Sequence, residues 1–457
     1  MDIKIIAKTD VDPLDLASHA AGVCYQSAIP EFGKRLDVEK RLFKPSHHTT
    51  LQHHSVTFAV EGIAVGDITF GMHLAHPFYN SDQRSGRYAA KMFLEPEDAY
   101  AKIEKYIKQF WPEVDGEILE KVMNYVKRGV DIYHGNIKKA EEVAEKFVSE
   151  ERPFASEIIK KNIPKYAQEQ MRMFIPVIFP TAFNLTLNKT ALIAMYESAW
   201  TQPMRYVTEE MARLFTDKYP ETVFMFNPER RRKTDWAASL NDISIRGVKH
   251  EPELELLNIY NADKFVEPSD DITHPVDRLH FTPEMMNNSI GEIAIKIKIS
   301  LAAMGQDQRH RTIRRSAPQF TGDFYLPPIL RELGLEQEAI SYLNEWKEIS
   351  KFAPETLAMI LAPYGAMVIY EKAGSFNAIA HEQGKRLCWC AQEEIYHLGR
   401  LQRLAIEEKL GKKHPLLNIF EPPCYRNGKC TEGDRYCGRD RSQKIINSDK
   451  YFPKRKI

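Results

Sequence analysis

The sequence lacks the features that would place it in several common classes. No apolar run approaches the roughly 18 residues that span a bilayer, and the start of the chain does not have the shape of a signal peptide. Neither Gly-x-Gly-x-x-Gly nor Gly-x-x-x-x-Gly-Lys-Ser/Thr occurs, which argues against Rossmann dehydrogenases and phosphate-loop NTPases. We therefore expect a cytoplasmic protein that does not act at a membrane.

An excess of one charge is also missing, and cysteine is scarce. Among 457 residues, 63 Lys and Arg balance 63 Asp and Glu, so no global field attracts nucleic acid and we expect no such partner. Six cysteines are too few for a disulfide scaffold in a chain of this length. A hydrophobic content of 43% allows large cores, and the length predicts about two to three domains.

One basic stretch stands out against this balanced background. Isoleucines at every second position from residue 293 to residue 299 predict a half-buried strand. Residues 305–316 follow it, with four arginines and a histidine between Arg309 and Arg315. Guanidinium groups bind phosphates and carboxylates bidentately, so the stretch is a candidate anion site. The alternative is a solvated basic face.

The motif Arg309-His310-Arg311, with Gln306 before it, resembles the signature of flavin-dependent thymidylate synthases. In that family, the motif loop grips the flavin. Further segments that resemble the family are Ser85-Gly86-Arg87-Tyr88, Arg172-Met173-Phe174-Ile175-Pro176, Leu185-Thr186-Leu187-Asn188, Lys385-Arg386 and Ala391-Gln392-Glu393-Glu394-Ile395. In the first half of the chain, Ala75-His76-Pro77 stands where the family has Arg-His-Arg.

The order of these segments repeats, which indicates an internal duplication. The resemblance implies an α+β fold of two tandem domains like the thymidylate synthase complementing proteins, each a small sheet packed with long helices. The predicted divisions are a first domain with the degenerate motif at 1–217, a linker with some short structure at 218–285, a second domain with the intact motif at 286–410, and a cysteine-containing tail at 411–457. Apolar stripes near residues 103–110, 119–126 and 137–147 predict three helices in the first domain.

The resemblance also implies roles for individual residues. The residues expected to bind the nucleotide are Gln306, Ser85, Arg87, Arg172 and Arg386, and Ser85, Arg87 and Arg386 are the expected catalytic residues. Those expected to bind the flavin are His53, Arg309, His310, Arg311 and Asn188. In the second copy, Met359 stands at the position of Arg172 and Ser375 at the position of Asn188. The two copies have therefore lost different residues. This pattern predicts a composite site that draws on both copies.

The activity that the resemblance implies is the reductive methylation of dUMP to dTMP. FAD would be the cofactor, with NADPH and methylenetetrahydrofolate as co-substrates, and a homodimer would rebuild the four-lobed assembly of the family. Two alternatives stay open. One is a related flavoenzyme that acts on another pyrimidine nucleotide, and the other is a non-catalytic flavin- or nucleotide-binding homologue.

Three cysteines lie close together near the end of the chain. Cys424, Cys430 and Cys437 could supply thiolates to a structural metal or an iron–sulfur site, with His414 or one of Cys388 and Cys390 as a further ligand. The alternative is a set of reduced or disulfide-linked surface cysteines. The sequence therefore predicts a candidate metal site in the tail, with Cys424, Cys430 and Cys437 as ligands.

Overall fold

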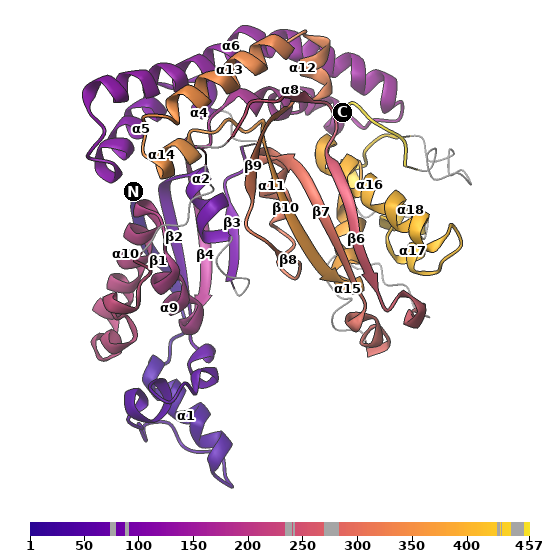
Figure 1. Ribbon diagram of the computed structural model, residues 1–457. Coiled ribbons are helices and arrows are strands. Elements are labelled where there is room, and N and C mark those ends of the chain that lie inside the picture. The colour runs from indigo at the N-terminus through magenta and orange to yellow at the C-terminus, as the bar shows by residue number, and fades with distance from the viewer. Residues whose placement is uncertain are drawn as a thin grey trace. The chain divides into compact units, whose positions relative to one another are not determined.

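The chain divides into two compact units. Figure 1 labels the helices and strands along the chain. The computed structural model describes residues 1–73, 79–86, 91–233, 240, 243–268, 283–426, 430, 432–439 and 452–457. The first unit comprises residues 1–85, 97–119 and 177–237, and the second comprises residues 86–96, 120–176 and 238–457. Both contain helices and a sheet, which confirms the predicted α+β class. None of the described helices could cross a membrane.

The first unit is built on a four-stranded antiparallel sheet. Its strands are β1 (Asp2–Lys8), β2 (Ser55–Ala64), β3 (Tyr79–Gln83) and β4 (Pro180–Asn188), in the order β1-β2-β4-β3. Side chains alternate along β2, so Val56, Phe58 and Val60 are buried. Helices α9 (Lys189–Ser198) and α10 (Gln202–Lys218) follow β4, and α10 packs against β1. The sheet therefore buries one face beneath these helices.

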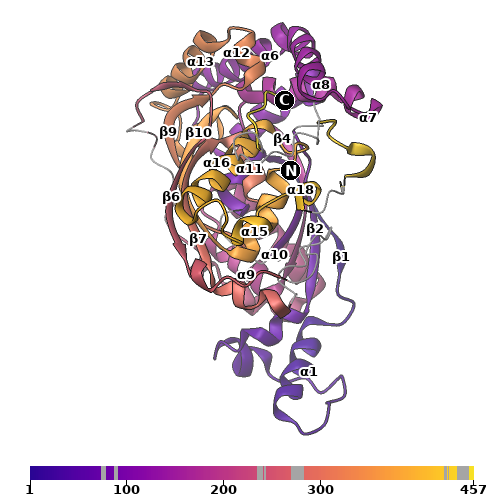
Figure 2. The same cartoon turned by 90° about the vertical axis from the view of Figure 1, so that its right-hand side faces the viewer.

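The second unit is built on a larger sheet with the order β5-β9-β10-β7-β6. Its strands are β5 (Gly247–Lys249), β6 (Glu253–Tyr260), β7 (Glu292–Ser300), β9 (Gln319–Tyr325) and β10 (Ala366–Ser375), and the short β8 (Arg314–Arg315) also pairs with β10. The four isoleucines of β7 are buried, which confirms the strand predicted there. Helices α15 (Phe376–Arg386) and α16 (Glu393–Leu410) cover one face of this sheet (Figure 2).

The two sheets share one strand order. In chain order, β1, β2, β3 and β4 correspond to β6, β7, β9 and β10, and both sets are arranged first-second-fourth-third with antiparallel pairing. The segment predicted as a linker supplies β5 and β6 to the second sheet. In β6, Leu254 and Leu256 alternate with exposed glutamates, a pattern of period two that fits an edge strand.

The prediction of three helices in the first domain was wrong. The structure has α5 (Glu97–Phe110) and one continuous helix of 36 residues, α6 (Gly116–Glu151). The apolar stripes near residues 119–126 and 137–147 are in phase, because buried Val126, Val130 and Tyr133 lie between them at helical spacing. Gly129 and Gly135 do not interrupt the helix. A glycine costs a helix only about 1 kcal/mol relative to alanine.

These two glycines predict opposite effects of alanine. A Cβ at Gly129 would lie 2.3 Å from the Tyr342 hydroxyl and 2.4 Å from the Phe174 carbonyl oxygen, whereas a Cβ at Gly135 meets nothing within 4 Å. We expect Gly129→Ala to lower the free energy of unfolding by about 1–3 kcal/mol through overpacking. Gly135→Ala should raise it by about 0.5–1 kcal/mol. Equal effects of the two variants in urea denaturation would contradict this packing.

Candidate functional site

The arginine-rich loop leaves the end of a central strand of the second sheet. Strand β7 ends at Ser300, whose hydroxyl accepts a hydrogen bond from Ala303 N at 3.1 Å and so caps the short helix α11 (Leu301–Asp307). The loop 308–313 follows, and β8 then returns to the sheet by pairing with β10. Both ends of the loop are thus fixed by regular structure.

Asp307 is the buried centre of the polar contacts that hold this loop. Its carboxylate accepts hydrogen bonds from Arg315 Nε at 2.5 Å, the Tyr370 hydroxyl at 2.8 Å and Lys372 Nζ at 2.6 Å. Burial alone would raise its pKa, but the charges of Arg315 and Lys372 hold the pKa of Asp307 well below its usual value. Lys372 also donates to Glu382 at 2.6 Å. A buried carboxylate is tolerated here because it is fully paired.

Arg315 belongs to the support of the loop. Besides Asp307, it donates to the carbonyl oxygens of His310 at 3.0 Å and Ile313 at 2.7 Å. Arg314 is exposed and forms an ion pair with Glu292. Arg309 and Arg311 flank His310 in the loop, and both are half-buried.

His310 is held in its neutral form within this cluster. The side chain is buried, and burial together with the positive charge of Arg386 lowers its pKa well below the usual value. Its ring meets the ring of His381 edge-on, with centroids 5.3 Å apart. Within the described part of the chain, Nε2 of His310 has no hydrogen-bond partner. A neutral imidazole can donate to or accept from a ligand through this atom.

Gln306 and Arg386 were both predicted from sequence as nucleotide-binding residues, and they are in direct contact. The Arg386 guanidinium donates to the Gln306 carbonyl oxygen, and the Gln306 side-chain amide donates to the Gln392 side chain. Arg386 ends α15, while Gln392 caps α16. Residues 80 positions apart therefore meet at the base of the loop. The buried Oε1 of Gln306 has no partner among the described residues.

Glu394 ties the start of α16 to the strand that carries the loop. One carboxylate oxygen accepts from Ser300 N at 2.7 Å, and the other accepts from the Ser300 hydroxyl. The group is fully buried, and this burial raises the pKa of Glu394 to about 8, with a further contribution from the neighbouring Glu393. The charge of Arg172 acts in the opposite direction. Burial therefore favours the protonated form of Glu394.

Arg172 lies in the second unit, with the intact motif. Its guanidinium lies over the ring of Tyr364 at 4.8 Å from the centroid, and the side chain is buried. Gly86 lies close to both groups, because an added Cβ would be 3.3 Å from Arg172 Nη1 and 3.5 Å from the Tyr364 hydroxyl. Gln168 Nε2 donates to the Gly86 carbonyl oxygen at 3.2 Å. Two segments of the resemblance, around Gly86 and around Arg172, thus pack together.

The remaining predicted residues are placed as follows. His53 ends a short 3-10 helix (His48–His53) of the first unit and is exposed. Asn188 caps α9 by accepting from Ala191 N at 2.9 Å, and Ser375 caps α15 in the same way at 3.2 Å. Ser85 is half-buried and precedes Gly86. Arg87 and the degenerate stretch Ala75-His76-Pro77 lie outside the described residues.

The sequence analysis missed the residues that support the site. Asp307, Lys372, Glu382 and Tyr370 form the buried cluster, and neither burial nor pairing is visible from their neighbours in sequence. Glu394 was noticed only as part of a family-like segment. A signal was available for it, because a paired Glu393-Glu394 at the start of a helix is a common N-terminal pattern.

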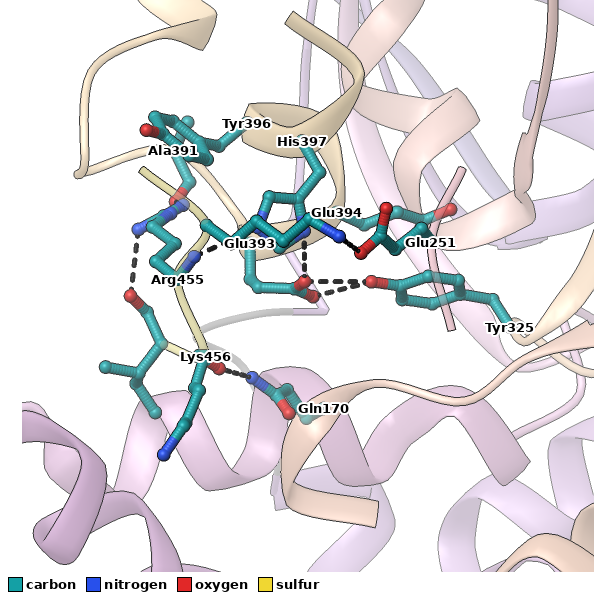
Figure 3. A network of polar contacts seen from close by, with 12 residues as sticks. Gln170, Glu251, Tyr325, Ala391, Glu393, Glu394, Tyr396, His397, Arg455 and Lys456 are labelled. Carbon is teal, nitrogen blue, oxygen red and sulfur yellow. Dashed lines mark hydrogen bonds and ion pairs between the residues drawn. The ribbon is translucent and has the colours of Figure 1, made fainter. Parts of the chain in front are cut away.

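A second polar network begins at Glu393, the residue next to Glu394, and includes Arg455 and Lys456 near the end of the chain (Figure 3). Glu393 accepts from the Tyr325 hydroxyl at 2.8 Å, and His397 Nδ1 lies 2.7 Å from its other oxygen. Arg455 donates its backbone N–H to His397 Nε2 at 3.1 Å, and its guanidinium donates to the carbonyl oxygens of Trp389 and Ala391. The segment between α15 and α16 is therefore bound at its ends to Gln306 and at its backbone to Arg455.

A family comparison bears on the origin of this arrangement. The model described as "Thymidylate synthase complementing protein" matches residues 4–221. Residues 4–221 of this chain are therefore similar to the thymidylate synthase complementing proteins. The resemblance stated from the sequence is thereby confirmed. The match ends before the Arg309-His310-Arg311 loop, so residues 286–410 are not part of it.

Similar solved structures include two of the flavin-dependent thymidylate synthase ThyX from Helicobacter pylori, both with FAD and dUMP. They are 18% and 19% identical to this chain, cover 51% of it and 100% of their own chains, and have TM-scores of 0.33. The UMP/dUMP methylase PolB from Streptomyces cacaoi, bound with 5-Br UMP, is 10% identical, covers 39% of this chain and 100% of its own, and has a TM-score of 0.31. A search of the curated proteins found no match. The assignment therefore rests on the family match.

The protonation of Glu394 predicts how stability depends on pH. Its folded pKa of about 8 lies above the unfolded value of about 4.3, so between these values the folded state holds a proton that the unfolded state lacks. The contribution of Glu394 to the free energy of unfolding should therefore fall as pH rises from about 5 to 8, by up to about 1.4 kcal/mol per pH unit. Glu394→Gln should remove this slope in urea denaturation. The exposed Glu371→Gln should leave it unchanged.

Proposed function

We propose that this chain is a FAD-dependent thymidylate synthase, a methyltransferase that converts dUMP to dTMP with methylenetetrahydrofolate and NADPH. The observation that carries the proposal is the contact between Gln306 and Arg386 beside the buried, neutral His310. Three residues that the family resemblance singles out converge there, although they come from the motif loop and from the end of a distant helix. The family match over residues 4–221 supports the same activity.

The residues of the motif loop fit an anionic, ring-bearing cofactor such as FAD. His310 Nε2 and Gln306 Oε1 are buried polar atoms without a partner among the described residues. Such atoms cost free energy unless a ligand or water satisfies them. Arg309 and Arg311 are cations on either side of His310, suited to the diphosphate of the cofactor. When bound, FAD would supply the hydride. The loop residues would bind and orient the FAD.

The nucleotide would be held by arginines. A phosphate dianion is bound most strongly by paired guanidinium donors, and Arg172 and Arg386 are the candidates in the second unit. The stacking of Arg172 on Tyr364 restricts its orientation, and Gly86 lies beside its guanidinium. Neutral His310 could then donate to or accept from a ring without adding a charge to the site.

We also propose that residues of both copies are required for activity. The shared strand order of the two sheets supports a duplication, and so do the equivalent caps at Asn188 and Ser375. The first copy keeps the asparagine and the second keeps the arginine-rich loop. Two chains would supply four copies, and we therefore propose a homodimer.

Complementation tests the activity directly. Expression of the chain in cells that lack any thymidylate synthase should remove their requirement for thymidine. The double variant Arg309→Ala, Arg311→Ala, expressed at the same level, should fail to do so. Growth that depends on neither arginine would contradict the assigned site, and an inactive but folded wild type would contradict the proposed function.

The loop arginines predict how much flavin the purified protein carries. Arg309→Ala should lower FAD occupancy, because a hydrogen bond to a charged group contributes roughly 1.5–3 kcal/mol. Arg314→Ala is the matched control, since Arg314 lies in the same stretch but is exposed and paired with Glu292. Absorbance in the flavin bands measures the result. A wild type that is colourless and takes up no added FAD would rule out the flavin.

The two nucleotide arginines predict similar losses of dUMP affinity. Arg172→Ala and Arg386→Ala should each weaken binding by about 1.5–3 kcal/mol, or roughly 10- to 150-fold in Kd, because each removes a charge-assisted contact. The exposed Arg331→Ala should have no effect. Calorimetric titration at matched flavin content gives the comparison. Normal affinity in Arg172→Ala beside a large loss in Arg386→Ala would mean that only the second copy binds the nucleotide.

A further inference from the structure

Five of the six cysteines gather around one place in the second unit. Cys388 and Cys390 lie between α15 and α16, whereas Cys424, Cys430 and Cys437 come from the tail. Cys388, Cys390, Cys424 and Cys430 line a cavity of about 260 Å³. All five line a smaller cavity of about 20 Å³ beside it. Two segments distant in sequence thus bring their thiols to a common space.

The described thiols are free, and their contacts leave them available to a ligand. No disulfide joins them in the described part of the chain. The Cys390 N–H donates to Cys388 Sγ at 3.5 Å, and Cys390 Sγ donates weakly to the Arg435 carbonyl oxygen at 3.3 Å. Among the described residues, no three His, Cys, Asp or Glu side chains already surround an ion-sized point. Ligation would therefore draw the thiolates inward from the cavity walls.

Cys437 differs from the other four. It is buried in an apolar cluster, and it does not line the larger cavity. The other members of this cluster are Leu387, Trp389, Tyr396, Tyr425 and Phe452. Cys390 and Cys424 pack against the same cluster, so one side of the cavity is shielded from water. Cys437 is consequently better described as a core residue than as a ligand.

The charges around the larger cavity suit a negatively charged centre. Four thiolates around Zn²⁺ carry a net charge of about −2. The cationic groups that line the cavity are Lys165, Lys385, Arg386 and Arg435, while Glu169 and Glu432 are the acidic ones. Cations therefore outnumber acids on the wall.

We propose that Cys388, Cys390, Cys424 and Cys430 form a four-thiolate metal site, occupied by Zn²⁺ or by an iron–sulfur cluster. Both take four cysteine thiolates, and each thiol releases its proton when the metal binds. The set differs from the one expected from sequence alone, because the Cys388/Cys390 pair replaces Cys437. The site would join the tail to the segment that separates α15 from α16. It does not depend on the proposed thymidylate synthase activity.

Elemental analysis of the full-length protein, purified without oxygen, tests the proposal. We expect about one zinc per chain, or iron with an equal amount of acid-labile sulfide, and the two results distinguish the two occupants. Protein that contains neither, and that does not bind added Zn²⁺ when fully reduced, would overturn the proposal.

Single substitutions identify the ligands. Cys388→Ser and Cys430→Ser should each lose most of the metal, whereas Cys437→Ser should retain it. Cys24→Ser is the matched control, because Cys24 is an exposed cysteine of the first unit. Loss of metal in Cys437→Ser with retention in Cys430→Ser would overturn this ligand set.

Thiol counting on the wild type gives a second readout that does not depend on whether the variants fold. A thiol reagent should find four cysteines protected until a chelator is added, after which they should react. If a reductant exposes them and a chelator does not, the cysteines are disulfide-linked and the proposal fails.

Discussion

The buried carboxylate of Asp307 is the interaction on which the candidate site depends. A carboxylate moved out of water costs several kcal/mol unless charged and hydrogen-bonding partners compensate it. Asp307 has three such partners, from β8 and β10, and Lys372 extends the cluster to Glu382 on α15. One charge thereby fixes the helix that precedes the loop, the strand that follows it and the helix that carries Arg386.

The segment between α15 and α16 connects this site to the rest of the second unit. Arg386 precedes the segment, and Gln392 and Glu394 follow it, each in contact with α11 or its cap. Within the segment, the Trp389 carbonyl oxygen accepts from Arg152 at 3.1 Å and from Arg455 at 2.8 Å. The proposed thiolate site includes Cys388 and Cys390 of the same segment. Residues of the tail are therefore linked to Arg386 through the backbone of this segment.

The helix caps next to the two sheets show how the proposed duplication would allow residues to be lost while the fold is kept. At the start of α9 and α15, the side chain at the cap accepts a backbone N–H, and either Asn188 or Ser375 serves this purpose. The replacement therefore preserves the helix while it removes an amide that could contact a ligand. Residues 173–176 and 363–365 also pair through their backbones, with Gly365 N donating to the Met173 carbonyl oxygen at 2.9 Å. This pairing involves equivalent parts of the two proposed copies. Because its hydrogen bonds are between backbone atoms, it does not depend on whether position 359 is an arginine or Met359.

The sequence by itself determined the features that are local or that recur as motifs. The alternating isoleucines of β7, the α+β class and the similarity of residues 4–221 to the thymidylate synthase complementing proteins could all be predicted, because periodicity and motifs are visible within short windows. The prediction of two separate helices at α6 was wrong, because the two apolar stripes lie on the same face of one continuous helix. Tertiary structure alone decided that Arg315 supports the loop, that Gln306 meets Arg386, and that both Cys388 and Cys390, but not Cys437, line the larger cavity with Cys424 and Cys430. These contacts link residues that are far apart in sequence, and strand pairing and helix packing bring them together, which no local pattern encodes.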